Sequence, residues 1–200
     1  KGGTVPGPVR YRMKADRIVT GTYLLAAAAS RGTVMIRNFP QELDALLYLL
    51  EKMGGDICRE EQKLLFSMPH RAHAPAFVET APYPGFPTDL QSPLMAVLAG
   101  ADGAGVIKEN VFENRFRTAG QLARMGAQIE IDGSCARVTG CKLCSNTVKA
   151  PDLRGGAALA LAALQADGVS TITGMEYVER GYEDLARDLR MLGAQVWEER

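Results

Sequence analysis

The chain has 200 residues, of which 46% are hydrophobic and 23% are charged, and this composition is typical of one globular domain of ordinary size. Lysine plus arginine and aspartate plus glutamate each total 23, so no net charge attracts the chain to nucleic acid or to an anionic membrane. Uninterrupted apolar runs such as residues 23–29 are too short to cross a bilayer. We therefore expect a folded cytoplasmic protein without a nucleic-acid or membrane partner.

Residues 1–14 are rich in glycine and proline and show no sustained hydrophobic period, so they predict a linker or an edge segment. A single domain is expected over residues 15–200. Within it, two apolar residues three positions apart and a following glycine occur at residues 50–54, 122–126 and 189–193. Each copy predicts a helix that ends at the glycine and a strand that follows it.

A helix rich in alanine and leucine is expected before each of these copies, at residues 22–29, 90–99 and 153–166. Small side chains allow helices to approach closely, which favours a position at the centre of the domain. In the first two copies a further strand is expected, at residues 63–68 and 135–139. The predicted unit is αβαββ, and the third copy lacks its last strand. The three copies of this unit are expected at residues 16–69, 88–140 and 152–200.

Residues 80–118 are the stretch whose order points most clearly to chemistry. A connector stiffened by three prolines delivers Thr88 and Asp89 to the start of the second central helix. A strand is expected at residues 105–109, and another helix follows it. That helix is predicted to open with a capping box formed by Thr118 and Gln121.

Asp89 has two interpretations. A carboxylate within reach of a substrate hydroxyl can take or steer its proton, as a general base does. The structural alternative is a helix cap, because Asp16 and Asp152 occupy the matching helix starts of the other two units and aspartate is a good N-cap. Repetition by itself favours the cap.

Three arginines also recur in matched places, each one or two residues after an acidic side chain: Arg115, Arg154 and Arg180. The guanidinium fork suits both phosphate and carboxylate groups, so the three could form an anion site. The alternative for each of them is an ordinary solvated ion pair at the surface.

Cys141 and Cys144 form a CxxC pair, which can supply two thiolates to zinc. No second pair stands at zinc-ribbon spacing, so free thiols are expected here and at Cys58 and Cys135. The sequence has no glycine-rich dinucleotide or P-loop motif either. We expect neither a metal site nor a cofactor.

Five segments follow one another along the chain: GFPTDLQ (85–91), ENVFENRF (109–116), RMGA (124–127), DLRGGAAL (152–159) and ERGYEDL (179–185). In this order they resemble the enolpyruvyl transferase family, and within it the UDP-N-acetylglucosamine 1-carboxyvinyltransferases. The resemblance runs from about residue 16 to the end of the chain and covers about half of such an enzyme.

The resemblance implies an α/β (α+β) fold, a pseudo-threefold inside-out barrel of αβαββ repeats with helices central and sheets outside. It also implies a second domain, formed by the N-terminal half of the same polypeptide, which carries the family's reactive cysteine. A piece of the extreme N-terminus would supply the strand that the third unit lacks. Without that strand an open sheet edge could pair two copies of the chain as a homodimer.

The site residues that the resemblance implies gather around the substrates. Asp89 matches the carboxylate that handles the acceptor hydroxyl, with Thr88 as a neighbouring contact. Val111 and Phe112 match a segment that lies along the nucleotide sugar. The remaining matches lie at or near the phosphoenolpyruvate site or the cleft between the domains, and they are Arg115, Arg154, Arg180, Asp16 and Arg17.

The activity that the resemblance implies is transfer of the enolpyruvyl group from phosphoenolpyruvate to the 3′-hydroxyl of UDP-N-acetylglucosamine. This is the first committed step of peptidoglycan synthesis, and so of cell-wall formation, cell shape and division. The isolated chain is expected to be inactive without its other half. Two alternatives remain open: a 3-phosphoshikimate 1-carboxyvinyltransferase, and a non-catalytic domain of this fold that acts as a scaffold or sensor.

Overall fold

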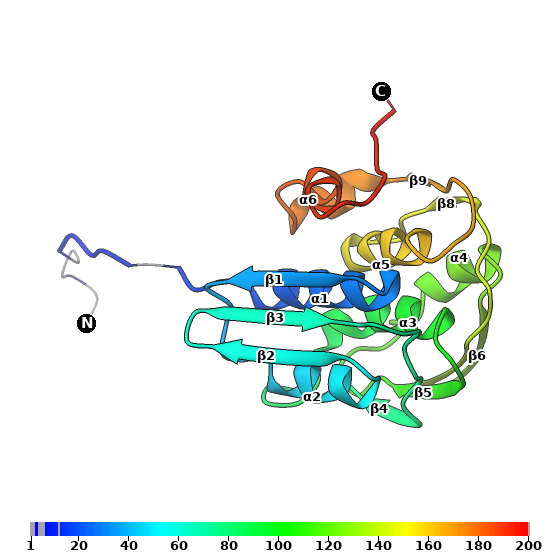
Figure 1. Ribbon diagram of the computed structural model, residues 1–200, viewed down its shortest axis with the longest axis horizontal. Coiled ribbons are helices and arrows are strands. Elements are labelled where there is room, and N and C mark those ends of the chain that lie inside the picture. Colours follow the sequence, from blue (N-terminus) through cyan, green and yellow to red (C-terminus); the bar gives the residue numbers. More distant parts are fainter. Residues whose placement is uncertain (1–2, 4–6, 12, 200) are drawn as a thin grey trace.

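The computed structural model describes residues 3, 7–11 and 13–199. Three helices form its centre and contact one another, and the sheets lie outside them (Figure 1). This arrangement confirms the predicted inside-out α/β architecture. The central helices are α1 (Arg17–Ser30), α3 (Gln91–Ala99) and α5 (Leu153–Ala163).

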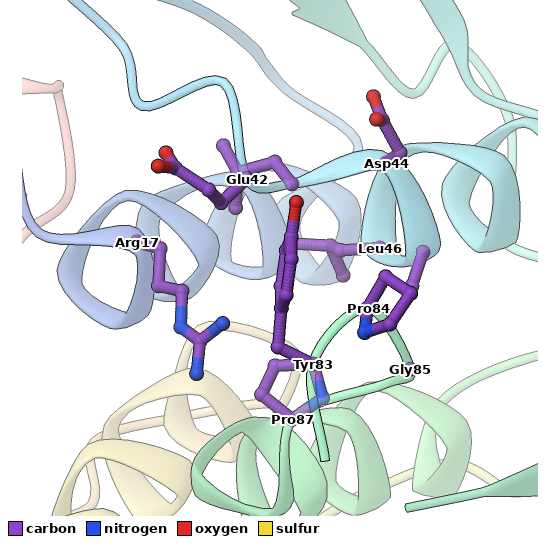
Figure 2. Close-up of a pocket in the computed structure, with 10 residues that line it drawn as sticks. Arg17, Glu42, Asp44, Leu46, Tyr83, Pro84, Gly85 and Pro87 are labelled. Atoms are coloured by element: carbon purple, nitrogen blue, oxygen red, sulfur yellow. The ribbon is translucent and has the colours of Figure 1, made fainter. Parts of the chain in front are cut away.

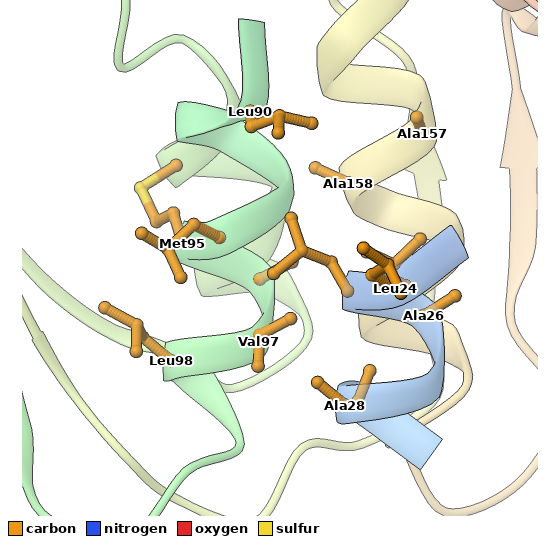
Figure 3. Close-up of a cluster of buried hydrophobic side chains, with 14 of the residues drawn as sticks. Leu24, Ala26, Ala28, Leu90, Met95, Val97, Leu98, Ala157 and Ala158 are labelled. Atoms are coloured by element: carbon orange, nitrogen blue, oxygen red, sulfur yellow. The ribbon is translucent and has the colours of Figure 1, made fainter. Parts of the chain in front are cut away.

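Small side chains explain why these three helices can share one core. Ala28 of α1 and Ala158 of α5 point toward α3, whereas Met95 and Leu98 lie on the side of α3 away from these two helices (Figure 3). A Cβ added at Gly21 would lie 2.5 Å from Cδ1 of Leu90, the residue before α3. The absence of a side chain at Gly21 therefore lets the start of α3 approach α1 closely. Every residue of α3 is buried. The start of α3 lies beside α1 at Gly21 and beside the start of α5, where Arg154 pairs with Asp89.

The sheets follow the repeat. In the first sheet β1 and β2 both pair antiparallel with β3, and in the second the order is β4-β5-β7-β6, with β4 parallel to β5. The third sheet holds only the parallel pair β8-β9. The bounds are β1 (Thr33–Arg37), β2 (Asp56–Glu60), β3 (Lys63–Ser67), β4 (Phe77–Glu79), β5 (Ala104–Lys108), β6 (Gln128–Asp132), β7 (Cys135–Thr139), β8 (Thr147–Lys149) and β9 (Thr171–Thr173).

The outer helices end as predicted. Gly54, Gly126 and Gly193 follow them with φ angles of 99°, 92° and 101°, a conformation that glycine adopts without strain. The outer helices are α2 (Asp44–Lys52), α4 (Thr118–Arg124) and α6 (Leu185–Met191), and two short 3-10 helices are η1 (Thr88–Leu90) and η2 (Met175–Arg180).

Two predicted local features are wrong. Thr118 and Gln121 form no capping box, because α4 has no side-chain cap at its start and the Gln121 side chain instead accepts a hydrogen bond from the backbone N–H of Lys149, at 2.9 Å. Residues 194–199 form no strand after Gly193, since within the described chain no neighbouring strand offers them hydrogen bonds. The connector strands β4 and β8 were not predicted, being only three residues long.

The expected linker at residues 1–14 is only partly described, because residues 1–2, 4–6 and 12 lie outside the described residues. The rest of that segment has no helix or strand and is exposed. In the part of the chain that the structure covers, no helix has the length and apolarity needed to cross a bilayer.

Substitution of Gly140 by alanine tests the close packing of the loop after β7. A Cβ there would lie 2.7 Å from the carbonyl carbon of Ala101 and would overlap its oxygen, so we expect a loss of about 1–3 kcal/mol in the free energy of unfolding. Gly120→Ala is the matched control, because nothing lies within 4 Å of its Cβ and alanine should stabilise α4 by about 0.5–1 kcal/mol. Equal urea midpoints for the two variants would contradict this packing.

Candidate functional site

The side chain of Asp89 lies between two guanidinium groups. Asp89 belongs to η1, the turn that leads into α3. Its Oδ1 accepts a hydrogen bond from Nη2 of Arg115 at 2.7 Å, and its Oδ2 accepts one from Nη2 of Arg154 at 3.0 Å. The two arginines come from different repeat units, so this carboxylate joins the second unit to the third.

The cap interpretation holds for the other two aspartates and fails for Asp89. Asp16 accepts hydrogen bonds from the N–H groups of Ile18 and Val19 at 2.7 and 3.1 Å, and Asp152 accepts one from Gly155 at 2.8 Å. The side chain of Asp89 makes no such bond, because η1 moves it from the cap position into a turn. Equivalent positions in the repeat therefore have different roles.

Arg154, in the first turn of α5, is the most enclosed member of the cluster. Its side chain is only 14% exposed, and its guanidinium carbon lies 5.7 Å from the centre of the Tyr182 ring. Within the described chain, its Nε and Nη1 are buried without a hydrogen-bond partner. Buried donors are nearly always satisfied, so these two suit an incoming anion.

Tyr182 closes the side of the cluster that faces α1. Its hydroxyl lies 2.7 Å from Oγ1 of Thr22 in a buried contact, and burial raises the pKa of this phenol above its usual value. A neutral ring beside Arg154 supports a cation–π contact without adding a competing negative charge. The contact between Tyr182 and Thr22 thus joins the third unit to α1 beside Arg154.

Arg115 approaches Asp89 from the segment between β5 and α4. Its side chain is 24% exposed, and its guanidinium carbon lies 5.4 Å from the centre of the Phe112 ring. The preceding Asn114 has a φ of 53°, a left-handed conformation that asparagine tolerates better than most residues. This turn directs Arg115 toward the start of α3.

Arg180 lies beside the cluster and not in it. It ends η2 and is exposed, and no hydrogen bond or ion pair of its side chain is found among the described residues. The next residue, Gly181, is close to Arg154, since a Cβ there would lie 3.4 Å from Nη1 of that arginine. The structure therefore joins Asp89, Arg115 and Arg154 and leaves Arg180 at the rim.

Thr88, Val111 and Phe112 lie next to the cluster. Thr88 donates a hydrogen bond to Glu109 at 2.9 Å, so its hydroxyl is engaged within the protein. Val111 and Phe112 are 37% and 56% exposed. They line an open groove that residues 109–117 form with the β6–β7 turn.

Arg17 lies beside the connector, at the start of α1. Its guanidinium carbon is 5.8 Å from the centre of the Tyr83 ring, and the two side chains border a small hollow between the connector and the start of α2 (Figure 2). Arg17 forms no ion pair with Asp16 or Glu42 in the described chain. Instead Glu42 pairs with Lys14 at 2.8 Å, and the carboxylate of Asp16 caps α1.

Sequence reasoning missed Glu109 and Tyr182. A signal for Glu109 was present, because the alternation of β5 places Gly105 and Ile107 inward and continues to residue 109. A charged residue at an inward position is unusual and marks a polar network. All four cysteines are free, and the described residues hold no group of three potential metal ligands.

Comparison with known proteins agrees with the fold. Residues 1–189 match the model of the EPSP synthase (3-phosphoshikimate 1-carboxyvinyltransferase) family. In solved structures, the enolpyruvyl transferase NikO from Streptomyces tendae superposes with a TM-score of 0.81 at 28% identity, over 91% of this chain and 44% of that one. EPSP synthase from Acinetobacter baumannii superposes with a TM-score of 0.74 at 16% identity, over 92% and 46%.

Curated relatives carry a narrower name. The chain is 45% identical to a UDP-N-acetylglucosamine 1-carboxyvinyltransferase of Desulfofundulus thermocisternus, over 96% of this chain and 79% of that protein. It is 43% identical to UDP-N-acetylglucosamine 1-carboxyvinyltransferase 2 of Bacillus subtilis (strain 168), over 96% of this chain and 45% of that protein. Apart from the first of these, the chain spans about half the length of the relatives that it matches.

The three-unit fold and its neighbours define an enolpyruvyl-transferase-like α/β domain. More particularly, the chain belongs to the EPSP synthase family.

Replacement of Asp89 by asparagine tests whether its carboxylate pairs with the arginines or caps a helix. Asp89→Asn leaves two guanidinium groups facing each other, so we expect a loss of about 1–2 kcal/mol in the free energy of unfolding. Because the remaining repulsion is screened by salt, the loss should shrink at high ionic strength. Asp152→Asn is the control, since asparagine caps as well as aspartate and should change stability by less than about 0.5 kcal/mol. Equal effects of the two substitutions would contradict the pairing.

Proposed function

We propose that this chain is one half of an enolpyruvyl transferase that moves the enolpyruvyl group of phosphoenolpyruvate to the 3′-hydroxyl of UDP-N-acetylglucosamine. The observation that supports it most is the cluster of Asp89, Arg115 and Arg154, with unpartnered buried donors on Arg154. In this cluster the carboxylate of Asp89, which can accept a proton, lies beside arginines that can bind anions. The reaction requires both a proton acceptor and an anion site.

The chemistry assigns a role to each group. The 3′-hydroxyl oxygen forms a bond to C2 of phosphoenolpyruvate while its proton passes to Asp89 and C3 receives a proton from an acid. The phosphate then leaves C2 of the tetrahedral intermediate while C3 gives up a proton to a base, and the C2–C3 double bond forms again. Arg115, Arg154 and the rim residue Arg180 hold the carboxylate and phosphate and stabilise the charge on the departing phosphate.

Phosphoenolpyruvate fits this cluster better than a neutral substrate would. Asp89 neutralises one of its two arginine partners, so one positive charge remains, and the Nε and Nη1 of Arg154 are buried donors without a partner in the described chain. Free guanidinium donors suit a carboxylate or a phosphate. The acceptor sugar would then lie along Val111 and Phe112, with Thr88, Asp16 and Arg17 near its path.

The nucleotide sugar is favoured over 3-phosphoshikimate by the names of the relatives. Relatives at 41–45% identity act, by name, on UDP-N-acetylglucosamine, whereas the EPSP synthase structures are only 15–16% identical. The acceptor 3-phosphoshikimate stays the second candidate because the family model carries that name. The role would place the protein in the cytoplasm, in peptidoglycan synthesis and cell division, without a cofactor or metal.

The other half of the active site is proposed to come from an N-terminal domain of the same polypeptide. That domain would supply the acid that protonates C3 and would close over Asp89 to exclude water. A homodimer through the open edge of the third sheet, which holds only β8 and β9 among the described strands, is the competing arrangement. A non-catalytic scaffold or sensor would keep the fold and lack the acid.

Phosphate release by the complete polypeptide tests the proposal. Turnover of phosphoenolpyruvate should require UDP-N-acetylglucosamine, the 200-residue chain alone should give none, and Asp89→Asn should lower kcat by about 100-fold or more. The control is Asp56→Asn, an exposed carboxylate at the start of β2, which should leave kcat unchanged. Turnover with 3-phosphoshikimate in place of the nucleotide sugar would show that the acceptor is assigned wrongly.

A further inference from the structure

Glu109 is a buried carboxylate that the reaction described above does not use. It follows β5 directly and is only 4% exposed. Its backbone N–H donates to the carbonyl of Ser134 at 2.8 Å, which fixes the residue against the β6–β7 turn. A buried negative charge is costly unless hydrogen bonds or a cation compensate it. The described residues provide no ion pair for Glu109, so the compensation comes from hydrogen bonds.

Four donors surround this carboxylate. Oε1 accepts from the hydroxyl of Thr80 at 2.8 Å and from the backbone N–H groups of Val111 and Phe112 at 2.8 and 3.1 Å. Oε2 accepts from the hydroxyl of Thr88 at 2.9 Å. Backbone N–H groups can only donate, so Oε1 must act as an acceptor.

The four donors come from the two segments that carry the ion pair. Thr88 precedes Asp89 in η1, and Phe112 stands three residues before Arg115. Thr80 adds a second link between these two segments, because its hydroxyl also accepts a hydrogen bond from the N–H of Asn110 at 2.9 Å. One side chain therefore fixes the backbone on both sides of the contact between Asp89 and Arg115.

We propose that Glu109 is a positioning residue that sets the distance between Asp89 and Arg115 and shapes the turn at residues 111–112. It does not touch the reacting atoms. Its kinetic consequence rests on the proposed function, whereas its effect on the backbone does not. A residue with a purely structural role would affect only the stability of the protein. A positioning residue also affects kcat and the hydrogen-exchange protection of the amides in the turn at residues 111–112.

The test compares Glu109→Leu, which has no acceptor, with Glu109→Gln, which keeps one carbonyl oxygen for the amides. In the complete polypeptide, hydrogen exchange is measured at the amides of Val111 and Phe112, together with phosphate release. Glu109→Leu should speed exchange at these amides by roughly tenfold or more and lower kcat by a similar factor, with a smaller change in KM. Glu109→Gln should restore both quantities to within about threefold of the original protein.

Two further variants keep the test decisive. Glu130→Leu, on the exposed face of β6, is the control and should change neither exchange at residues 111–112 nor kcat. Thr80→Val removes one donor at nearly constant volume and should give the same pattern about threefold more weakly, even if Glu109→Leu does not fold.

The outcomes separate the two proposals. Unchanged exchange at Val111 and Phe112 in both Glu109→Leu and Thr80→Val would overturn the positioning role, as would faster exchange with an unchanged kcat. Absence of turnover in the original polypeptide would instead overturn the proposed function, and the exchange data would still decide whether Glu109 holds the turn.

Discussion

One carboxylate between two guanidinium groups is the constraint on which the rest of the structure depends. Asp89 can meet Arg115 and Arg154 only if the starts of α3 and α5 lie side by side. That in turn requires the central helices to approach closely, which the alanines of α1 and α5 and the absence of a side chain at Gly21 permit. Small residues in the core and charged residues at the rim are thus parts of one arrangement.

The repeat explains where the site can form. Three units place three helix starts at one end of the core, and each start carries an aspartate. Two of these aspartates satisfy backbone N–H groups, which is the ordinary use of such a residue. At the third, η1 displaces the carboxylate from the cap position and leaves it available for the arginines. An aspartate position that recurs at all three helix starts therefore has a different role in the second unit.

Much of the fold could be predicted from the sequence because its signals are local. The periodic central helices, the glycines at residues 54, 126 and 193, and the strands β3 and β7 follow from spacing and backbone preference. The capping box at Thr118 was predicted wrongly because the partner of Gln121 is a strand 28 residues further along the chain. The strand after Gly193 was predicted wrongly because strands depend on neighbours that no local pattern reveals.

The site was harder to predict, for a related reason. Asp16, Asp89 and Asp152 look alike in sequence, and only tertiary geometry distinguishes a cap from an ion pair. The resemblance to a known family separated them, and the structure supplies the physical basis of the separation. Glu109 was missed although its inward position in the alternation of β5 was visible, because its four donors lie in two separate segments.

Asp89 and Arg154 should be energetically coupled across two repeat units. A double-mutant cycle measures this coupling directly, with unfolding free energies for the original chain, Asp89→Asn, Arg154→Met and the double variant. We expect a coupling energy of about 1 kcal/mol or more, since the two groups share a partly buried hydrogen bond. Additivity of the two single effects within about 0.3 kcal/mol would contradict it.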